Sequence, residues 1–439
     1  MKKSLLAVAA IGAFASAAQA QSSVTVYGIL DVGYVGANSS VTSANVPTQN
    51  YATNSTTYTN GAVKTTQSQF GQSAEQTSRM GFKGTEDLGN GKSAFFTVEF
   101  GLTPNSAGAS TTTAANGTAL NNRQSFVGLK QNGLGDVAIG TQYQPVHISV
   151  GKTDPGMQNN MTGSVIYTGQ ADSGVTGAVG GNTAAYQSRS SNGLTLNSEV
   201  MAGIQLHAMA ILNNTNATTL NNTAAGQTGN VATGGNTNTN GWALGADYTF
   251  KKFFITGAYT AVKNLTTTTN QLAYPNAAAA TAGTTNNGGF AIWSGAQTAL
   301  NVQDNTGYVG ATYDFGILKA YASWISRKAS DTANSAYYQK RQAEQIGVRS
   351  FVTPTVEAWA SAGVGTFTPY GLNQNSAHFN AWQLGSNYWL SKRTNLYAIY
   401  GQYAQANATY VSTTTAGAST TGNSSNNANS YAVGIRHTF

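Results

Sequence analysis

Residues that could carry catalysis or bind a metal are few in this chain of 439 residues, of which only 8% are charged. The absence of cysteine excludes zinc–thiolate sites, disulfide bonds and cysteine nucleophiles. No two histidines have the i, i+4 spacing of a helical zinc site; they are His147, His207, His378 and His437. No Ser–His–Asp order can be told from chance in so serine-rich a chain. The sequence therefore predicts no enzyme, no metal and no cofactor.

The remaining candidates are basic residues that are scattered at strand spacing: Arg79, Lys83, Arg123 and Arg349, with the acid Asp31 nearby in the pattern. The pI near 9.3 does not indicate nucleic-acid binding, because the chain has no Lys/Arg cluster interleaved with stacking aromatics. Scattered cations act together where a fold gathers them around one aqueous space with low-dielectric walls, which concentrates anions. The alternative for Arg79 and Arg123 is a salt bridge within the wall, to Asp31 or Glu99.

The elements that must position these residues are β-strands with one apolar face. In 24–35, Val24, Val26 and Leu30 alternate with Thr25 and Asp31, and the same period of two recurs to the end of the chain. We predict sixteen strands, at 24–35, 77–87, 92–102, 122–131, 136–144, 183–190, 194–204, 240–250, 253–263, 304–314, 317–326, 342–353, 356–366, 378–390, 394–405 and 430–439.

The connections between these strands alternate in length. Seven are tight turns, at 88–91, 132–135, 191–193, 251–252, 315–317, 354–355 and 391–393, and eight are long polar loops, at 36–76, 103–121, 145–182, 205–239, 264–303, 327–341, 367–377 and 406–429. An even number of strands with short turns on one rim and long loops on the other is typical of an outer-membrane barrel. The predicted fold is all-β: a 16-stranded antiparallel transmembrane β-barrel with short periplasmic turns and long extracellular loops. Sixteen strands leave room for a water-filled channel.

Two segments lie outside the regular strand pattern. Residues 1–20 have a positive start, an apolar stretch and an A-x-A site, so we predict a cleaved signal peptide with cleavage between Ala20 and Gln21, and a mature barrel of 21–439. The loop 145–182 has apolar stretches that its Thr/Asn-rich neighbours lack, and we expect it to fold inward and constrict the channel. Its acids Asp154 and Asp172 would oppose the basic wall; the alternative is an extracellular lid with each acid capping a turn.

The last strand alternates apolar residues up to the chain end: Tyr431, Val433, Ile435 and Phe439 share one face. A barrel-assembly machinery can recognise such a tail by strand pairing. We therefore predict an outer-membrane insertion signal here, a role that gains weight from the signal peptide.

Several blocks together resemble the Gram-negative general porins of the betaproteobacterial (Burkholderia, Comamonas and Neisseria) type. They span the mature chain and lie at 22–31, 77–89, 122–129, 388–397 and 433–439. The resemblance implies trimers in the outer membrane, an inward-folded third loop, and passive diffusion with anion preference in several members. It also implies that Arg79 and Arg123 are wall residues of the constriction. Some members have a third arginine at the end of the inward loop, where residues 177–182 contain no basic residue.

The function that we predict is a general diffusion porin with weak to moderate anion preference, which passes small hydrophilic solutes and ions and does not bind nucleic acid. The expected partners are two further copies of the chain in a homotrimer, outer-membrane lipid and lipopolysaccharide, and the barrel-assembly machinery. Two alternatives remain: a substrate-specific channel for small anionic solutes, and an adhesin-like surface barrel that uses the Thr/Asn-rich loops.

Overall fold

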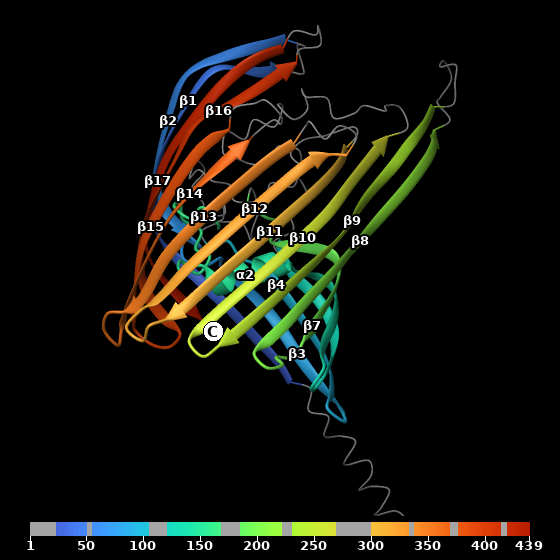
Figure 1. The fold of residues 1–439 in the computed structure, drawn as a ribbon, viewed down its shortest axis with the longest axis vertical. Coiled ribbons are helices and arrows are strands. Elements are labelled where there is room, and N and C mark those ends of the chain that lie inside the picture. Colours follow the sequence, from blue (N-terminus) through green and yellow to red (C-terminus); the bar gives the residue numbers. More distant parts are fainter. Residues whose placement is uncertain are drawn as a thin grey trace, which may run out of the picture.

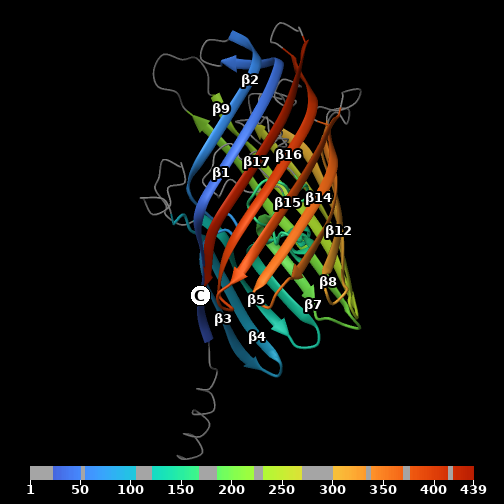
Figure 2. The same ribbon diagram turned by 90° about the vertical axis from the view of Figure 1, so that its left-hand side faces the viewer.

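The described residues form one antiparallel sheet that is rolled into a tilted barrel (Figure 1). The computed structural model describes residues 23–50, 55–104, 121–167, 185–221, 231–268, 300–332, 338–368, 376–413 and 419–439. The strands are β1 (Ser23–Asn50), β2 (Ser55–Gln72), β3 (Arg79–Gly89), β4 (Lys92–Gly101), β5 (Asn121–Gln131), β6 (Gly135–Tyr143), β7 (Arg189–Ser198), β8 (Ile204–Asn221), β9 (Val231–Phe250), β10 (Phe253–Thr268), β11 (Leu300–Asp314), β12 (Lys319–Asp331), β13 (Tyr338–Phe351), β14 (Val356–Thr368), β15 (Ala377–Trp389), β16 (Thr394–Thr413) and β17 (Ser419–Thr438). Among these residues one helix, α2 (Pro145–Thr153), lies inside the barrel (Figure 2).

The sheet closes through β1, which pairs with the last strand on one edge. Ile29 to Ala44 pair with Thr438 to Asn423 of β17, and Phe439 exchanges two backbone hydrogen bonds of 3.1 Å with Gly28. On its other edge β1 pairs first with β3, over residues 23–29, and then with β2, over residues 32–50. β2 and β3 therefore occupy two halves of one position in the wall. The barrel has sixteen such positions, which confirms the predicted fold.

Side chains alternate between an apolar outer face and a polar inner face. On β13, Ile346 and Val348 are exposed outside, whereas Gln345 is buried inside. Exposed aromatic residues ring the outer face near both ends of the wall: Trp242, Tyr259 and Trp324 lie toward the loops, and Phe250, Tyr313, Phe315, Phe351 and Tyr388 lie toward the turns. An apolar band between two aromatic girdles is the outer surface of a bilayer-spanning barrel. Among the described residues, no helix is long and apolar enough to cross a membrane.

Two of the predicted strands are displaced in the structure. Residues 185–188 of the predicted sixth strand, 183–190, form no strand, since strand pairing begins only at Arg189, and the predicted turn at 191–193 lies within β7. The strand after it is β8, which we had expected to be part of the long loop 205–239. The missed strand continues in a polar sequence: Asn213 to Thr219 pair residue by residue with Thr239 to Thr233. Backbone pairing beyond the apolar band needs no apolar face, so hydrophobic periodicity does not detect it.

Strand pairing beyond the apolar band also lengthens the strands near the β1–β17 seam. β1 and β2 pair far into the predicted loop 36–76, and β16 and β17 pair into the predicted loop 406–429. The predicted signal peptide, its cleavage site at Ala20 and Gln21, and the loop residue Asp172 lie outside the described residues.

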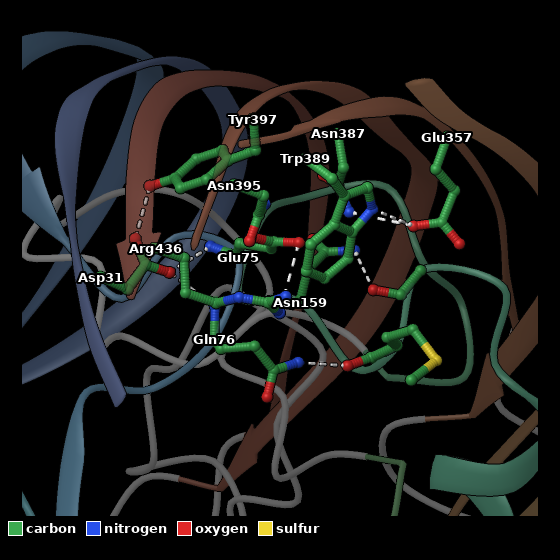
Figure 3. A network of polar contacts seen from close by, with 12 residues as sticks. Asp31, Glu75, Gln76, Asn159, Glu357, Asn387, Trp389, Asn395, Tyr397 and Arg436 are labelled. Carbon is green, nitrogen blue, oxygen red and sulfur yellow. Dashed lines mark hydrogen bonds and ion pairs between the residues drawn. The ribbon is translucent and has the colours of Figure 1, made fainter. Parts of the chain in front are cut away.

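Asp31 is hydrogen-bonded to residues 73–78, the segment between β2 and β3, and Figure 3 shows it within a polar network. It is fully buried, and its carboxylate accepts hydrogen bonds from the backbone N–H groups of Glu75 (2.8 Å) and Gln76 (2.6 Å) and from the hydroxyl of Tyr397 (2.6 Å). Glu75 in turn accepts from the amide of Asn395 (2.9 Å) and pairs with Arg436 (3.4 Å). Asp31 therefore binds residues 73–78 to the seam of the barrel and forms no ion pair with Arg79.

We predict that Asp31→Ala destabilises the barrel by about 3 kcal/mol, because three donors lose their buried acceptor. Tyr397→Phe removes one of the three bonds, and we expect a loss of about 1 kcal/mol. The measurement is the free energy of unfolding in urea, with each variant folded into lipid vesicles. A wild-type value for Asp31→Ala would show that this network does not hold residues 73–78.

Candidate functional site

The chain between β6 and β7 enters the barrel as α2 and continues inside the wall to residue 167. Pro145 begins the helix, where its missing N–H costs no hydrogen bond. Val146 and Val150 are fully buried in one cluster with Ala258, Tyr308 and other inward residues of β10 to β16. Lys152 forms an ion pair with Asp247 of β9, and Ser149 shares a hydrogen bond of 2.8 Å with Thr256 of β10. The helix is thus packed and hydrogen-bonded to one side of the inner wall.

Glycines of the wall form the surface on which this inner segment packs. An added Cβ at Gly401 would collide with the carbonyl oxygen of Thr162, and one at Gly363 would collide with the side chain of Val165. Two other wall glycines collide with loop residues in the same way, Gly310 with Thr153 and Gly347 with Pro155, and a Cβ at Gly245 would make a tight contact of 3.2 Å with Pro145. Because these glycines lie on different strands, they form a track that lets the backbone of residues 145–167 lie close to the wall. We call it the glycine track.

Polar side chains of the wall fix the same segment after the helix. Gln345 accepts the N–H of Val165 (3.0 Å), and its amide group donates to Asp154 (3.0 Å). Gln383 donates to the carbonyls of Met161 (2.8 Å) and Thr162 (2.9 Å), and Arg341 donates to that of Val165 (2.7 Å). These bonds satisfy loop backbone groups that would otherwise be buried without partners.

Two of the predicted site residues belong to this anchoring system. Asp154 is buried and also accepts the N–H of Gln158 (2.7 Å), and burial raises the pKa of its carboxyl group. Arg349 binds both oxygens of Glu357 (2.5 and 2.7 Å) and donates to the carbonyl of Pro155 (2.8 Å). Both residues hold the loop against the wall, and their hydrogen-bonding groups point at protein atoms.

Arg123 and Arg79 lie on the strands across from this segment. Arg123 donates through Nε to Glu99 (2.8 Å) and through Nη2 to the hydroxyl of Tyr143 (2.8 Å). Arg79 donates to the side-chain oxygen of Gln76 (2.9 Å). The wall salt bridge that we considered for both arginines thus forms for Arg123 with Glu99, whereas Arg79 is held by a neutral amide.

Lys83 lies on the same strand as Arg79, four residues closer to the short turns. Its side chain is exposed, and its ammonium group lies over the ring of Tyr27, 5.4 Å from the centroid. Lys83 therefore stands at the turn-side approach to the arginines.

Arg189 is the basic residue that the sequence analysis missed. It is the first residue of β7, directly after the inward loop, and its guanidinium lies over the ring of Tyr143 at 5.9 Å. Burial, with the positive charges of Arg189, Arg123 and Arg79, lowers the pKa of His147 to about 3. His147 is therefore neutral at neutral pH, and three arginines are near enough to it to act on its protonation. The signal for Arg189 was present in the sequence, but the sequence analysis looked for a third basic residue only in 177–182.

Three positively charged side chains lie near His147. Arg123 is ion-paired with Glu99, and the charges of Arg79, Arg123 and Arg189 all act on His147, whose ring contacts those of Tyr143 and Tyr186. Among the described residues no group of three or more metal-ligating side chains could hold an ion. We refer to Arg79, Arg123 and Arg189 as the arginine group.

A family model described as Gram-negative porin matches residues 7–408, and the chain belongs to this family. An outer membrane porin protein of Bordetella pertussis is 35% identical over 159 residues, which are 35% of this chain and 37% of that protein. The major outer membrane protein P.IB of Neisseria gonorrhoeae is 32% identical over 166 residues, 38% of this chain and 39% of that protein. The matches thus span less than two-fifths of the length of these relatives.

Two solved structures have the same fold along nearly the whole chain. An anion-selective porin from Comamonas acidovorans superposes with a TM-score of 0.54 at 19% identity and covers 95% of this chain and 100% of its own. OmpF of Salmonella typhi, in complex with daunomycin, gives 0.52 at 16% identity and covers 95% and 97%. The family resemblance expected from the sequence is confirmed, and with it the outer membrane of a Gram-negative bacterium as the location. At the level of the family, the relatives are channels and not enzymes.

We predict that Gly401→Val lowers the single-channel conductance in planar bilayers. The new side chain occupies the place of the Thr162 carbonyl, so the loop must move from the wall toward the lumen. The matched control is Gly257→Val on the outer face, where a Cβ makes only an ordinary contact at 3.8 Å. Equal conductance of both variants and the wild type would refute a role for the glycine track in positioning the loop.

Proposed function

We propose that this protein is a general diffusion porin that carries no enzymatic activity, passes small hydrophilic solutes and ions down their gradients, and prefers anions. The observation that supports the proposal is the arginine group beside the inward loop, in which Arg123 is ion-paired with Glu99 and all three arginines act on His147. The arginines stay protonated at any physiological pH. Their combined field, focused by the low-dielectric wall, raises the local concentration of anions and lowers that of cations.

Arg189 changes the expected strength of this preference. Residues 177–182 lack a basic side chain, which predicted a weak to moderate selectivity, but Arg189 follows them and acts on His147 together with the other two arginines. We therefore expect a clear anion preference. The similar fold of the anion-selective Comamonas porin is consistent with this proposal, although the likeness at 19% identity concerns the fold alone.

The further features of a porin are part of the proposal. We expect residues 1–20 to be removed as a signal peptide, the mature chain 21–439 to assemble as a homotrimer, and loop 145–182 to form the constriction. One solved structure with the same fold, OmpT of Vibrio cholerae, is described in a trimer form, with a TM-score of 0.54 at 12% identity. The face with Tyr431, Val433, Ile435 and Phe439 is the proposed signal for the barrel-assembly machinery; Val433 is 58% exposed.

We predict that replacing Arg79, Arg123 and Arg189 together by serine shifts the reversal potential in a KCl gradient from the anion side toward the cation side. The physical reason is the loss of three fixed positive charges at the narrow part of the lumen. A matched control removes three lysines from the periplasmic turns, Lys251, Lys252 and Lys392, and should leave the potential nearly unchanged. Cation selectivity of the wild type, or an equal shift in the two triple variants, would contradict the proposal.

The conductance should rise almost linearly with KCl concentration, because a general pore has no saturable site. Conductance is measured in planar bilayers, and phosphate is then added as a competing anion. Block of the chloride current that saturates with phosphate would favour the substrate-specific channel for small anions. A purified, folded protein with negligible conductance would favour the adhesin-like barrel.

A further inference from the structure

Tyr143 lies between two members of the arginine group. It is the last residue of β6, the strand that pairs with β5 on one side and with β7 on the other. Arg123 is on β5, and Arg189, on β7, is the residue directly opposite Tyr143 in the register. Directly opposite residues of an antiparallel pair share one face of the sheet. The strand order therefore puts the side chain of Tyr143 between the two cations on the inner wall.

Each part of the Tyr143 side chain contacts one arginine. The hydroxyl oxygen accepts a hydrogen bond of 2.8 Å from Nη2 of Arg123. The ring faces the guanidinium group of Arg189, whose Cζ atom lies 5.9 Å from the ring centroid. A cation over an aromatic ring is attracted by the ring quadrupole at distances up to about 6 Å. One side chain thus offers a lone pair to one arginine and a π-face to the other.

The inner loop holds the ring of Tyr143 in place. The ring of His147, on α2, packs against it, with centroids 4.4 Å apart and an angle of 32° between the planes. His147 in turn contacts the ring of Tyr186, and a hydrogen bond of 3.2 Å joins its Nδ1 to the hydroxyl of Tyr186. Tyr143 is half-buried in these surroundings. Because the loop fixes the ring, the ring gives the arginines a fixed point to bind.

A neutral anchor suits two cations that must attract anions. Guanidinium groups on neighbouring parts of one inner face repel each other. A carboxylate between them would offset the repulsion but would also cancel one of the charges, as Glu99 does on the far side of Arg123, where it accepts the Nε hydrogen bond (2.8 Å). The phenol of Tyr143 binds both arginines and leaves their charge intact.

We propose that Tyr143 is the positioning residue of the arginine group. Its hydroxyl fixes Arg123, its ring fixes Arg189, and it acts on the permeating anion through these two side chains. The effect on ion preference rests on the proposed anion-selective function, whereas the effect on the position of the arginines does not depend on it.

The first test measures the position of each arginine without reference to selectivity. The purified, folded protein is treated in detergent with phenylglyoxal, which modifies accessible guanidinium groups, and peptide mass spectrometry gives the rate at each arginine. Tyr143→Phe should raise the rate of Arg123 about five-fold through the lost hydrogen bond and leave that of Arg189 unchanged. Tyr143→Leu should in addition raise the rate of Arg189 about three-fold, because the π-face is lost. Arg79, which is bound to Gln76, is the internal reference and should keep its rate.

The matched control is Tyr186→Leu. It removes an aromatic ring that contacts the same His147, but within the described part of the chain Tyr186 forms no hydrogen bond or cation–π contact with an arginine. The three arginines should therefore react at wild-type rates in this variant. The inference is overturned if Tyr143→Leu leaves the rates of Arg123 and Arg189 unchanged, or if the control raises them equally. A rise at Arg79 of the same size would also overturn it, since the tyrosine would then only support the fold.

Reversal potentials in a KCl gradient connect position with ion preference. Tyr143→Leu should shift the potential from the anion side toward that of the double variant Arg123→Ser/Arg189→Ser. In the double variant the same substitution should cause no further shift, because the groups that it acts on are gone. A shift of equal size in both backgrounds would contradict the inference. A wild type without anion preference would contradict the proposed function instead, while the modification rates still decide whether Tyr143 positions the arginines.

Discussion

The closure of β1 onto β17 is the constraint on which the rest of the structure depends. Within hydrocarbon every backbone N–H and C=O must find a partner in the protein, so a spanning sheet cannot keep a free edge. Residues 29–44 of β1 supply that partner for the last strand, and Gly28 and Phe439 complete the seam at the turn-side end. Once the sheet is closed, each strand has one face toward lipid and one toward water. The scarcity of charge in the sequence follows from this division, because the outer face excludes charge within the apolar band.

An aqueous lumen creates a second problem, which is how to hold a loop inside it. Residues 145–167 have little regular structure after α2, so most of their backbone groups depend on the wall. The glycine track lets the loop approach closely, and Gln345, Gln383, Arg341 and Arg349 then bind its carbonyl and N–H groups. Close approach and hydrogen bonding reinforce each other. A wall side chain can form a hydrogen bond of 2.7 to 3.0 Å to the loop backbone only where the neighbouring wall residues have no bulky side chains.

The sequence was sufficient to predict a barrel with sixteen strand positions, because the apolar strands rest on a local pattern of period two, although the predicted strand 183–190 took the place of β8 in that number. The sequence did not predict the strand pairing that continues beyond the apolar band into water. β8 and the outer parts of β1, β2, β16 and β17 have no apolar face, so only the register with a neighbouring strand defines them. At the site, Arg79 and Arg123 were found as isolated cations on a strand face. Arg189 was missed because a third basic residue was sought only in 177–182, a few residues too early. The anchoring roles of Asp154 and Arg349 depend on contacts with residues about 190 positions away.

The seam and the constriction are also connected to each other. Asp31 and Glu75 bind residues 73–78 to β1, β16 and β17, as Figure 3 shows. From the other side of this segment, Gln76 donates to the carbonyl of Met157 in the inner loop (2.6 Å) and accepts from Arg79 (2.9 Å). One short interruption in the wall is thus bound by the closing strands, by the loop and by a member of the arginine group. Selectivity requires an arginine to keep a fixed position relative to the loop. Here Arg79 and the inner loop are both hydrogen-bonded to the segment 73–78, and the closing strands of the barrel hold that segment in place.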